Sequence, residues 1–253
     1  MSGQDGLAQA LVDLQELAEQ LRRECPWDRE QTARTIVPHT VEEAYEVADA
    51  AYADDDAKLV DELGDLLFQT FFLSLLLEEK GAGDLAQVAR GIHTKLVRRH
   101  PHVFGDAAVD SAGAVNRRWE ELKTEEEGRE GIFHHVPETL PALLLAQKVQ
   151  RRAATAGFEY PDLAGAFSDL DDEIGELRSE PSEEELGDVL FAAVNVARHL
   201  SVDPELALRR ASARFVERVE RAAELAAAEG KEFASLPLDE QDRYFDLAKA
   251  EAP

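Results

Sequence analysis

Apolar residues recur every three to four positions through nearly every segment of the chain, and runs of β-branched residues are few. This spacing places apolar side chains on one face of an α-helix, and the abundance of Ala, Leu and Glu favours helices as well. Prolines and the Gly81–Gly83 turn separate the periodic segments. The pattern predicts an all-α fold with helices near residues 5–24, 38–53, 57–79, 84–100, 111–126, 139–156, 161–178, 183–200, 204–229 and 238–251.

The two halves of the chain repeat one another. The heptapeptide ELGDLLF at residues 62–68 returns as ELGDVLF at residues 185–191, and each copy follows a helix with two acidic residues three positions apart. Basic residues come after each copy, and an aromatic residue four positions before a lysine closes each half. Four features that repeat in the same order indicate an internal duplication. We therefore expect two domains of four to five helices each, at residues 1–127 and 139–253, with a linker at residues 128–138.

Four acidic residues of the first half are expected to converge. Glu43 and Glu46 lie three positions apart, as do Glu62 and Asp65, so each pair occupies one helix face. The turn between the two helices falls near residues 53–55, and an antiparallel hairpin then brings the pairs opposite each other. The second half has a hairpin shortened by about one helical turn in each arm, which keeps the corresponding residues opposed: Glu173, Glu176, Glu185 and Asp188.

Such a cluster is costly unless a cation neutralises it, because like charges repel and apolar neighbours penalise an unpaired carboxylate. Leu63, Leu66 and Phe68 flank the first cluster, so it lies at the edge of an apolar core. Magnesium prefers oxygen ligands and commonly bridges carboxylates to substrate phosphates, and manganese accepts similar ligands. The pattern predicts Mg²⁺ at both clusters, held in the first half by Glu43, Glu46, Glu62 and Asp65, with Glu42 assisting the attacking water or a second metal.

Other interpretations of these acids remain open. The chain holds 53 acidic residues, so a single pair at this spacing is typical of a solvated helix face. Glu185 also follows Ser182 at the spacing of a capping box, which would account for it without any metal. A di-iron carboxylate bundle is disfavoured, because it requires a histidine three positions after a glutamate and none of the seven histidines has that spacing.

Basic residues are rare enough that their grouping is informative. The net charge is −26, so the chain repels nucleic-acid polymers and anionic membranes, and it needs a basic patch or bound cations to handle phosphates. Lys95, Arg98 and Arg99 form such a patch at a predicted helix end, where cations also complement the helix dipole. Trp119, one turn before Lys123, is either a packed side chain or a platform for a base. The residues expected to bind substrate are Lys95, Arg98, Arg99, Trp119, Lys123, Arg214, Arg218 and Lys249.

The remaining composition narrows the class of protein. The 253 residues allow one large domain or two small ones, and 44 % apolar residues suffice for a core. The sequence shows no signal peptide and no apolar run of the roughly 18 residues that a membrane span needs. Its one cysteine, Cys25, forms no intrachain disulfide, and we expect a cytoplasmic protein. Walker, dinucleotide-binding, nucleophile-elbow and zinc motifs are missing, so carboxylates and metal must carry any chemistry.

Taken together, the motifs resemble the MazG family of nucleoside triphosphate pyrophosphohydrolases in its two-repeat form. The resemblance covers almost the whole chain and rests on the acidic pairs of both halves, on CPWD at 25–28, on KLVRRHPHVF at 95–104 and on NVARHL at 195–200. The second half departs from the pattern, because Asp172 stands where a glutamate is usual and Phe245 replaces a tryptophan. The first half is therefore the better match, while either half or both can be active.

This resemblance implies a fold, a reaction and partners. The implied fold is a tandem pair of MazG-like helical bundles that dimerise through their helices, with magnesium held by the ExxE and ExxD carboxylates. The implied reaction is attack of water on the α–β phosphoanhydride of ordinary or aberrant NTPs and dNTPs, which releases a monophosphate and pyrophosphate and cleans the nucleotide pool. Two alternatives remain: a narrower, dUTPase-like hydrolase on the same scaffold, and a non-catalytic acidic helical module that binds nucleotides or a protein.

Overall fold

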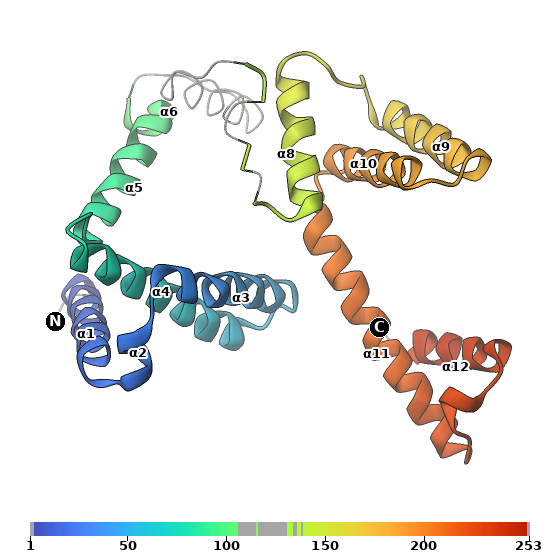
Figure 1. Cartoon of the computed structure of the whole chain (residues 1–253), viewed down its shortest axis with the longest axis horizontal. Coiled ribbons are helices and arrows are strands. Elements are labelled where there is room, and N and C mark those ends of the chain that lie inside the picture. The colour runs from blue at the N-terminus through green and yellow to red at the C-terminus, as the bar shows by residue number, and fades with distance from the viewer. Residues whose placement is uncertain (1–2, 106–114, 116–130, 134–135, 138, 252–253) are drawn as a thin grey trace. The chain divides into compact units, whose positions relative to one another are not determined.

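A computed structural model describes residues 3–105, 115, 131–133, 136–137 and 139–251 of the 253-residue chain (Figure 1). The chain divides into two units, Met1–Gly128 and Arg129–Pro253. All regular elements of the described residues are helices, which confirms the all-α fold expected from the apolar periodicity. The predicted helix at residues 111–126, and with it Trp119 and Lys123, lies outside the described residues apart from residue 115. None of the described helices is long and apolar enough to cross a membrane.

The first unit is built around an antiparallel helical hairpin. α3 and α4 are its two arms, and they make the largest contact of the unit. α1 packs across α4, and α5 continues beyond the end of α4 (Figure 1). The helices of this unit are α1 (Gly3–Glu24), α2 (Pro26–Glu30), α3 (Ala33–Tyr52), α4 (Asp56–Glu79), α5 (Leu85–Arg99) and α6 (Pro101–Phe104).

α3 begins at Ala33, earlier than the start near residue 38 that the apolar spacing predicts. Thr32 and Thr35 form a reciprocal capping box: the Thr35 N–H donates to Thr32 Oγ1 at 3.3 Å, and the Thr32 N–H donates to Thr35 Oγ1 at 2.9 Å. The added turn also buries Ile36 against α4. Capping and burial together outweigh the hydrogen bond that Pro38 cannot donate inside the helix.

A short turn between α3 and α4 determines which residues of the hairpin face each other. Asp54 adopts a left-handed conformation with φ of 52°, which aspartate tolerates better than most residues. Asp55 then caps α4, because its Oδ1 accepts the Lys58 N–H at 3.0 Å. The position of this turn places the acidic pairs of the two helices opposite each other.

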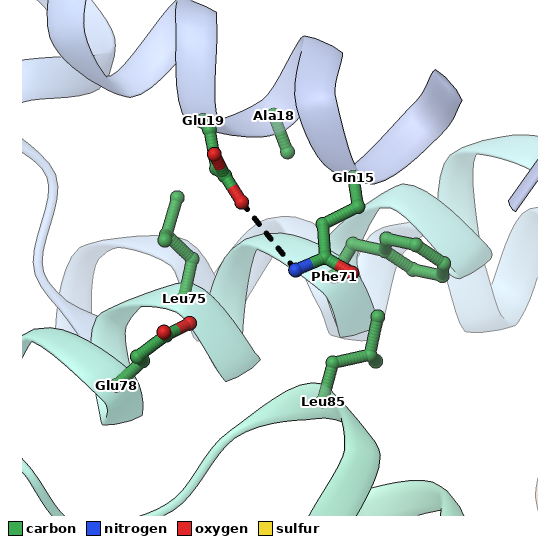
Figure 2. Close-up of a pocket in the computed structure, with 7 residues that line it drawn as sticks. All are labelled: Gln15, Ala18, Glu19, Phe71, Leu75, Glu78 and Leu85. Carbon is green, nitrogen blue, oxygen red and sulfur yellow. Dashed lines mark hydrogen bonds between the residues drawn. The ribbon is translucent and has the colours of Figure 1, made fainter. Parts of the chain in front are cut away.

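The contact between α1 and α4 closes the other side of the first unit. Figure 2 shows Gln15, Ala18 and Glu19 of α1 facing Phe71 and Leu75 of α4. The cavity that they line measures about 10 Å³, which is room for one water molecule at most. This contact therefore serves packing rather than ligand binding.

The second unit repeats the hairpin. α9 and α10 form its arms, α8 packs on α10, and α11 leads from the end of α10 to the α12 helix, which buries Tyr244 against α11 (Figure 1). The elements are α8 (Ala142–Thr155), α9 (Leu163–Ser179), α10 (Glu183–His199), α11 (Pro204–Ala228), the 3₁₀ turn Phe233–Ser235 and α12 (Leu238–Glu251).

Candidate metal centre

Three carboxylates meet across the hairpin of the first unit. Glu43 comes from α3, Glu62 and Asp65 come from α4, and one oxygen of each lies within 4.8 Å of the others. Glu62 is buried, Glu43 is half-buried and Asp65 is exposed, so the cluster opens to solvent on one side. Oxygens that share one cation at about 2.0–2.6 Å lie no more than about 5 Å apart. The spacing of this first cluster is thus suited to a single divalent ion.

The buried member, Glu62, is held by two neighbours. The Glu46 carboxyl lies next to it, and Lys58 Nζ lies 3.8 Å from its Oε1. Burial is the largest cause that raises the pKa of Glu62, and the adjacent Glu46 carboxyl raises that pKa further. Lys58 was not among the residues predicted from sequence, although its place one helical turn before Glu62 is the spacing of an ion pair.

The ionised form of Glu43 is also destabilised by burial and by neighbouring carboxylates. Burial raises its pKa most, followed by the charges of Asp65, Glu46 and Glu42. Glu42 itself points outward, with its Oε2 3.7 Å from His39 Nδ1, and it does not join the three converging carboxylates. The structure therefore gathers Glu43, Glu62 and Asp65, with Glu46 next to Glu62, and it leaves Glu42 on the solvent side.

A second cluster occupies the corresponding place in the second unit. Glu173 of α9 and Glu185 and Asp188 of α10 present oxygens within 4.8 Å of one another. Burial is the first cause that raises the pKa of both Glu173 and Glu185, and the nearby charges of Asp188 and Glu176 raise both pKa values further. The duplicated sequence thus produces a duplicated arrangement of carboxylates.

The Glu185 carboxylate is not used for helix capping. Ser182 Oγ accepts the Glu185 backbone N–H at 3.1 Å, which is one half of a capping box. The Glu185 side chain points into the cluster instead, where its Oε2 is shielded from solvent and makes no hydrogen bond. Buried polar atoms nearly always have a partner, so this oxygen fits a ligand atom of a cation.

The surroundings of the two clusters differ. The open space beside the first is bordered by residues of α4 only, at positions 57–65. A cavity of about 670 Å³ adjoins the second, and Glu173 forms part of its wall. Residues of α8, α9, α10 and the segment 157–160 line this cavity, and sequence reasoning did not assign it. The one signal was the NVARHL segment, which contains the cavity residues Asn195 and Arg198.

The predicted phosphate-binding cations lie away from the clusters within each unit. In the first unit, α5 starts beyond the C-terminal end of α4, which lies far from the hairpin turn. In the second unit, α11 likewise starts beyond the C-terminal end of α10, and α12 packs against α11 (Figure 1). Trp119 and Lys123 lie outside the described residues. The residues on these helices are Lys95, Arg98 and Arg99 of α5, Arg214 and Arg218 of α11, and Lys249 of α12.

Known proteins resemble this chain over most of its length. A family model described as the MazG nucleotide pyrophosphohydrolase domain matches residues 31–104, which contain the first cluster. The chain is 40 % identical over 237 residues to the nucleoside triphosphate pyrophosphohydrolase of Escherichia coli (strain K12), covering 89 % of this chain and 90 % of that protein. It is 38 % identical over 231 residues to the nucleoside triphosphate pyrophosphohydrolase/pyrophosphatase MazG of Thermotoga maritima, covering 89 % of each. The crystal structure of a mazG-related protein from Thermotoga maritima matches 45 % of this chain and 98 % of its own, at 26 % identity and a TM-score of 0.40.

Proposed function

The chain belongs to the MazG family of nucleotide pyrophosphohydrolases, and on this premise we propose that it hydrolyses nucleoside triphosphates to a monophosphate and pyrophosphate. The enzyme class follows from relatives that carry that name and share nearly the full length of the chain. The observation in the structure that supports it best is the convergence of three carboxylates across each hairpin, at corresponding positions of the two units.

Both clusters fit a divalent cation with oxygen ligands. Each gathers several acids whose pKa values are raised by burial and by each other's charge, and the Glu185 Oε2 oxygen is buried without a partner. A cation at such a site lowers the pKa of a bound water and neutralises negative charge that develops on the phosphates. We assign Mg²⁺, with Mn²⁺ as a substitute, to Glu43, Glu46, Glu62 and Asp65 in the first unit and to Glu173, Glu176, Glu185 and Asp188 in the second.

Side chains near the clusters have separate roles in this proposal. Glu42 is adjacent to Glu43 but outside the convergent set, so its carboxylate is our candidate for orienting the attacking water. Glu46 lies next to Glu62 across the hairpin, where it is our candidate for the fourth ligand of the first cation. Lys58 stabilises the negative charge of Glu62 before a substrate arrives.

A homodimer is the second part of the proposal. Leu63 and Leu67 of α4 and the corresponding Leu186 and Leu190 of α10 are all about half exposed, and they form the same apolar stripe on both hairpins. Exposed apolar stripes of this kind commonly mark interfaces. Pairing of these stripes between copies would cover them. It would also allow exposed cations such as Lys95 and Arg98 to reach the phosphates bound by another copy, whereas Arg99 is buried.

The substrate range that we propose covers ordinary and aberrant NTPs and dNTPs, with a role in cleaning the nucleotide pool. These details and the cytoplasmic location expected from composition rest on the family resemblance. The metal, by contrast, is suggested by the carboxylates of this chain.

The experiment that tests this function measures pyrophosphate and monophosphate release from a panel of NTPs and dNTPs, with Mg²⁺ and with EDTA. We expect both products in equal amounts and only with the metal. Release of orthophosphate would contradict the position of the cut. Release confined to dUTP would identify a narrower hydrolase, and tight nucleotide binding without either product would identify a binding module.

A further inference from the structure

The C-terminal helix α12 is positioned chiefly by its packing on α11 (Figure 1). Tyr244 and Ala248 of α12 are buried against two alanines of α11, Ala222 and Ala226, and these four residues form a small core of their own. The small side chains let the two helices approach closely, and the tyrosine ring fills the space between them. The direction in which α12 presents its exposed side chains therefore depends on this contact.

The Tyr244 hydroxyl fixes the ring from the end of α11. It donates a hydrogen bond of 2.5 Å to Oε2 of Glu229, the residue directly after α11. The same oxygen lies 3.4 Å from Arg243 Nη2, and the Arg243 guanidinium stands 4.4 Å from the centre of the Tyr244 ring. Buried tyrosine hydroxyls usually have such a partner, and this one links the buried face of α12 to a fixed point on α11.

Two further contacts hold the stretch of α12 that carries Lys249. Phe245 of α12 contacts Phe215 of α11, with 5.7 Å between the ring centroids. Glu251 Oε2, at the end of α12, pairs with Arg221 Nε of α11 at 2.7 Å. Lys249 lies between Phe245 and Glu251 in sequence, so α12 presents it beside the same stretch of α11.

Three cations of these two helices form no ion pair with any described residue. They are Lys249 of α12 and Arg214 and Arg218 of α11, and Arg218 lies within the stretch of α11 just described. By contrast, Arg221 and Lys231 each pair with a glutamate, at 2.7 and 2.8 Å. In a chain with 53 acidic and 27 basic residues, cations that face no carboxylate are available to an anionic ligand.

We propose that Tyr244 is a positioning residue for substrate binding, because its hydrogen bond to Glu229 orients α12 so that Lys249 joins Arg214 and Arg218 in holding the triphosphate. The proposal rests on the pyrophosphohydrolase function and on the substrate role expected for these three cations, and it adds what sets their geometry. Tyr244 is fully buried and touches no substrate. It acts through Lys249, because rotation of α12 about its axis would turn this exposed lysine away from α11.

Packing alone does not require the hydroxyl. A phenylalanine fills nearly the same volume as a tyrosine, and Ala222 and Ala226 would pack against either ring. What the hydroxyl adds is a directional bond, which is satisfied in one orientation of α12 only. Tyr244→Phe therefore separates the orientation of the helix from its packing.

Binding of inorganic tripolyphosphate with Mg²⁺ present tests the proposal on the full chain without depending on turnover. Tyr244→Phe should weaken this binding roughly 3- to 10-fold, which is the range expected for one hydrogen bond. Lys249→Met should weaken it at least as much, because it removes the cation. The deciding variant is the double mutant, since Tyr244→Phe should have no further effect once Lys249 is replaced.

Changes at Glu229 test the same hydrogen bond from its other side. Glu229→Gln keeps an oxygen that can accept from the Tyr244 hydroxyl, so it should bind tripolyphosphate as the wild type does. Glu229→Leu removes the acceptor and should match Tyr244→Phe. Glu224→Gln is the control for the lost charge, because Glu224 is an exposed glutamate of α11 that pairs within its own helix, with Arg221 at 2.9 Å. It should leave tripolyphosphate binding unchanged.

The outcomes separate the positioning role from the proposed function. Wild-type binding in Tyr244→Phe would overturn the role. So would an equal loss with and without the Lys249 side chain, because general loosening of the two helices does not act through that lysine. Glu229 is half exposed, so Glu229→Leu remains informative if Tyr244→Phe folds poorly. If the wild type releases no pyrophosphate but Tyr244 and Lys249 remain coupled in tripolyphosphate binding, the reaction is wrong and the positioning role stands.

Discussion

The two hairpins of this chain carry the same acidic pairs, and they differ in the residues further along their second helices, α4 and α10. In the first, Phe72 packs with Ile36 and Leu76 in an apolar core. In the second, the corresponding Asn195 joins Arg198 in a hydrogen-bonded network at the wall of a cavity. After the duplication, one copy thus used this position for packing and the other used it to form a polar pocket.

This difference shows that the residues matched by a family model and the residues that line a large cavity need not coincide. The family model matches residues 31–104 of the first unit, yet the large cavity adjoins the cluster of the second. The sequence signature records the carboxylates and the helix faces around them. The pocket depends on a few polar residues that a general pattern does not require.

Phe72 and Asn195 provide the largest contrast in stability. Phe72→Ala should lower the unfolding free energy of the first unit by about 3–5 kcal/mol, because it leaves a cavity in a packed core. Asn195→Ala should cost the second unit only about 1 kcal/mol, since it removes one hydrogen bond to a charged group that keeps its Glu159 partner.

Urea unfolding of the full chain can separate the two effects, because both tryptophans, Trp27 and Trp119, belong to the first unit. Tryptophan fluorescence follows that unit, and far-ultraviolet circular dichroism follows both. Equal losses for the two variants would contradict the difference between an apolar and a polar wall.

Removing one ligand from each cluster tests which unit carries turnover. Loss of a residue that only supports a metal ligand lowers metal affinity or activity roughly 10- to 100-fold. Asp188→Asn removes a proposed direct ligand, so it should lower kcat/KM for NTP hydrolysis by at least about 100-fold. Asp65→Asn should cost less than about 10-fold if turnover takes place in the second unit. Asp65 and Asp188 are both exposed, so neither change should disturb folding.

The reverse order would place catalysis in the first unit and leave the cavity without a role in it. Similar losses in both variants would indicate two working sites per chain. Circular dichroism of each variant provides the control for folding. Titration with Mg²⁺ shows whether the lost activity follows lost metal binding.

Sequence was sufficient for the hairpins and the convergence of the acids. Helix faces follow from a spacing of three to four residues, so Glu43 and Glu46 had to share a face, and the turn before α4 set them opposite Glu62. The predicted start of α3 near residue 38 is too late, because the Thr32–Thr35 capping box and the burial of Ile36 extend the helix back to Ala33.

The cavity could not be predicted in the same way. Its polar wall depends on Glu159 meeting Arg198 and on Gln150 meeting the carbonyl of Phe191, and these partners are 39 and 41 positions apart in sequence. Pairings at such distances depend on the packing of α8 and the segment before α9 onto α10. Helical periodicity carries no information about them.

The Glu159–Arg198 ion pair in the cavity wall should make the stability of the second unit sensitive to acid. Arg198 lowers the pKa of Glu159 chiefly through its hydrogen bonds, and His199 lowers it further. A lowered pKa means that the ionised form stabilises the folded state, so the contribution is fully present above the ordinary glutamate pKa, about 4.3, and is lost as the pH falls through the lowered value.

Glu159→Gln should therefore reduce the unfolding free energy of the second unit by about 1–2 kcal/mol at pH 7, and the difference from wild type should shrink below pH 4. Glu79→Gln is the matched change in the first unit, where Glu79 pairs with Arg22 at 2.7 Å but is more exposed. It should cost less than about 1 kcal/mol. A gap for Glu159→Gln that stays constant into acid would show that its charge is not the cause.

The smallest effect concerns two glycines at corresponding positions of α4 and α10. A methyl group added at Gly64 or at Gly187 meets no atom within 4 Å, and glycine inside a helix costs about 0.5–1 kcal/mol relative to alanine. Gly64→Ala and Gly187→Ala should each stabilise their own unit by that amount in dilute solution.

Both glycines lie beside the exposed stripes of Leu63 with Leu67 and Leu186 with Leu190. Close approach of a second copy is a reason to keep a glycine there, so the alanine variants should also weaken self-association in sedimentation experiments. A variant that is more stable and associates as well as the wild type would show that its helix face is not part of the dimer, and would leave the other hairpin as the interface.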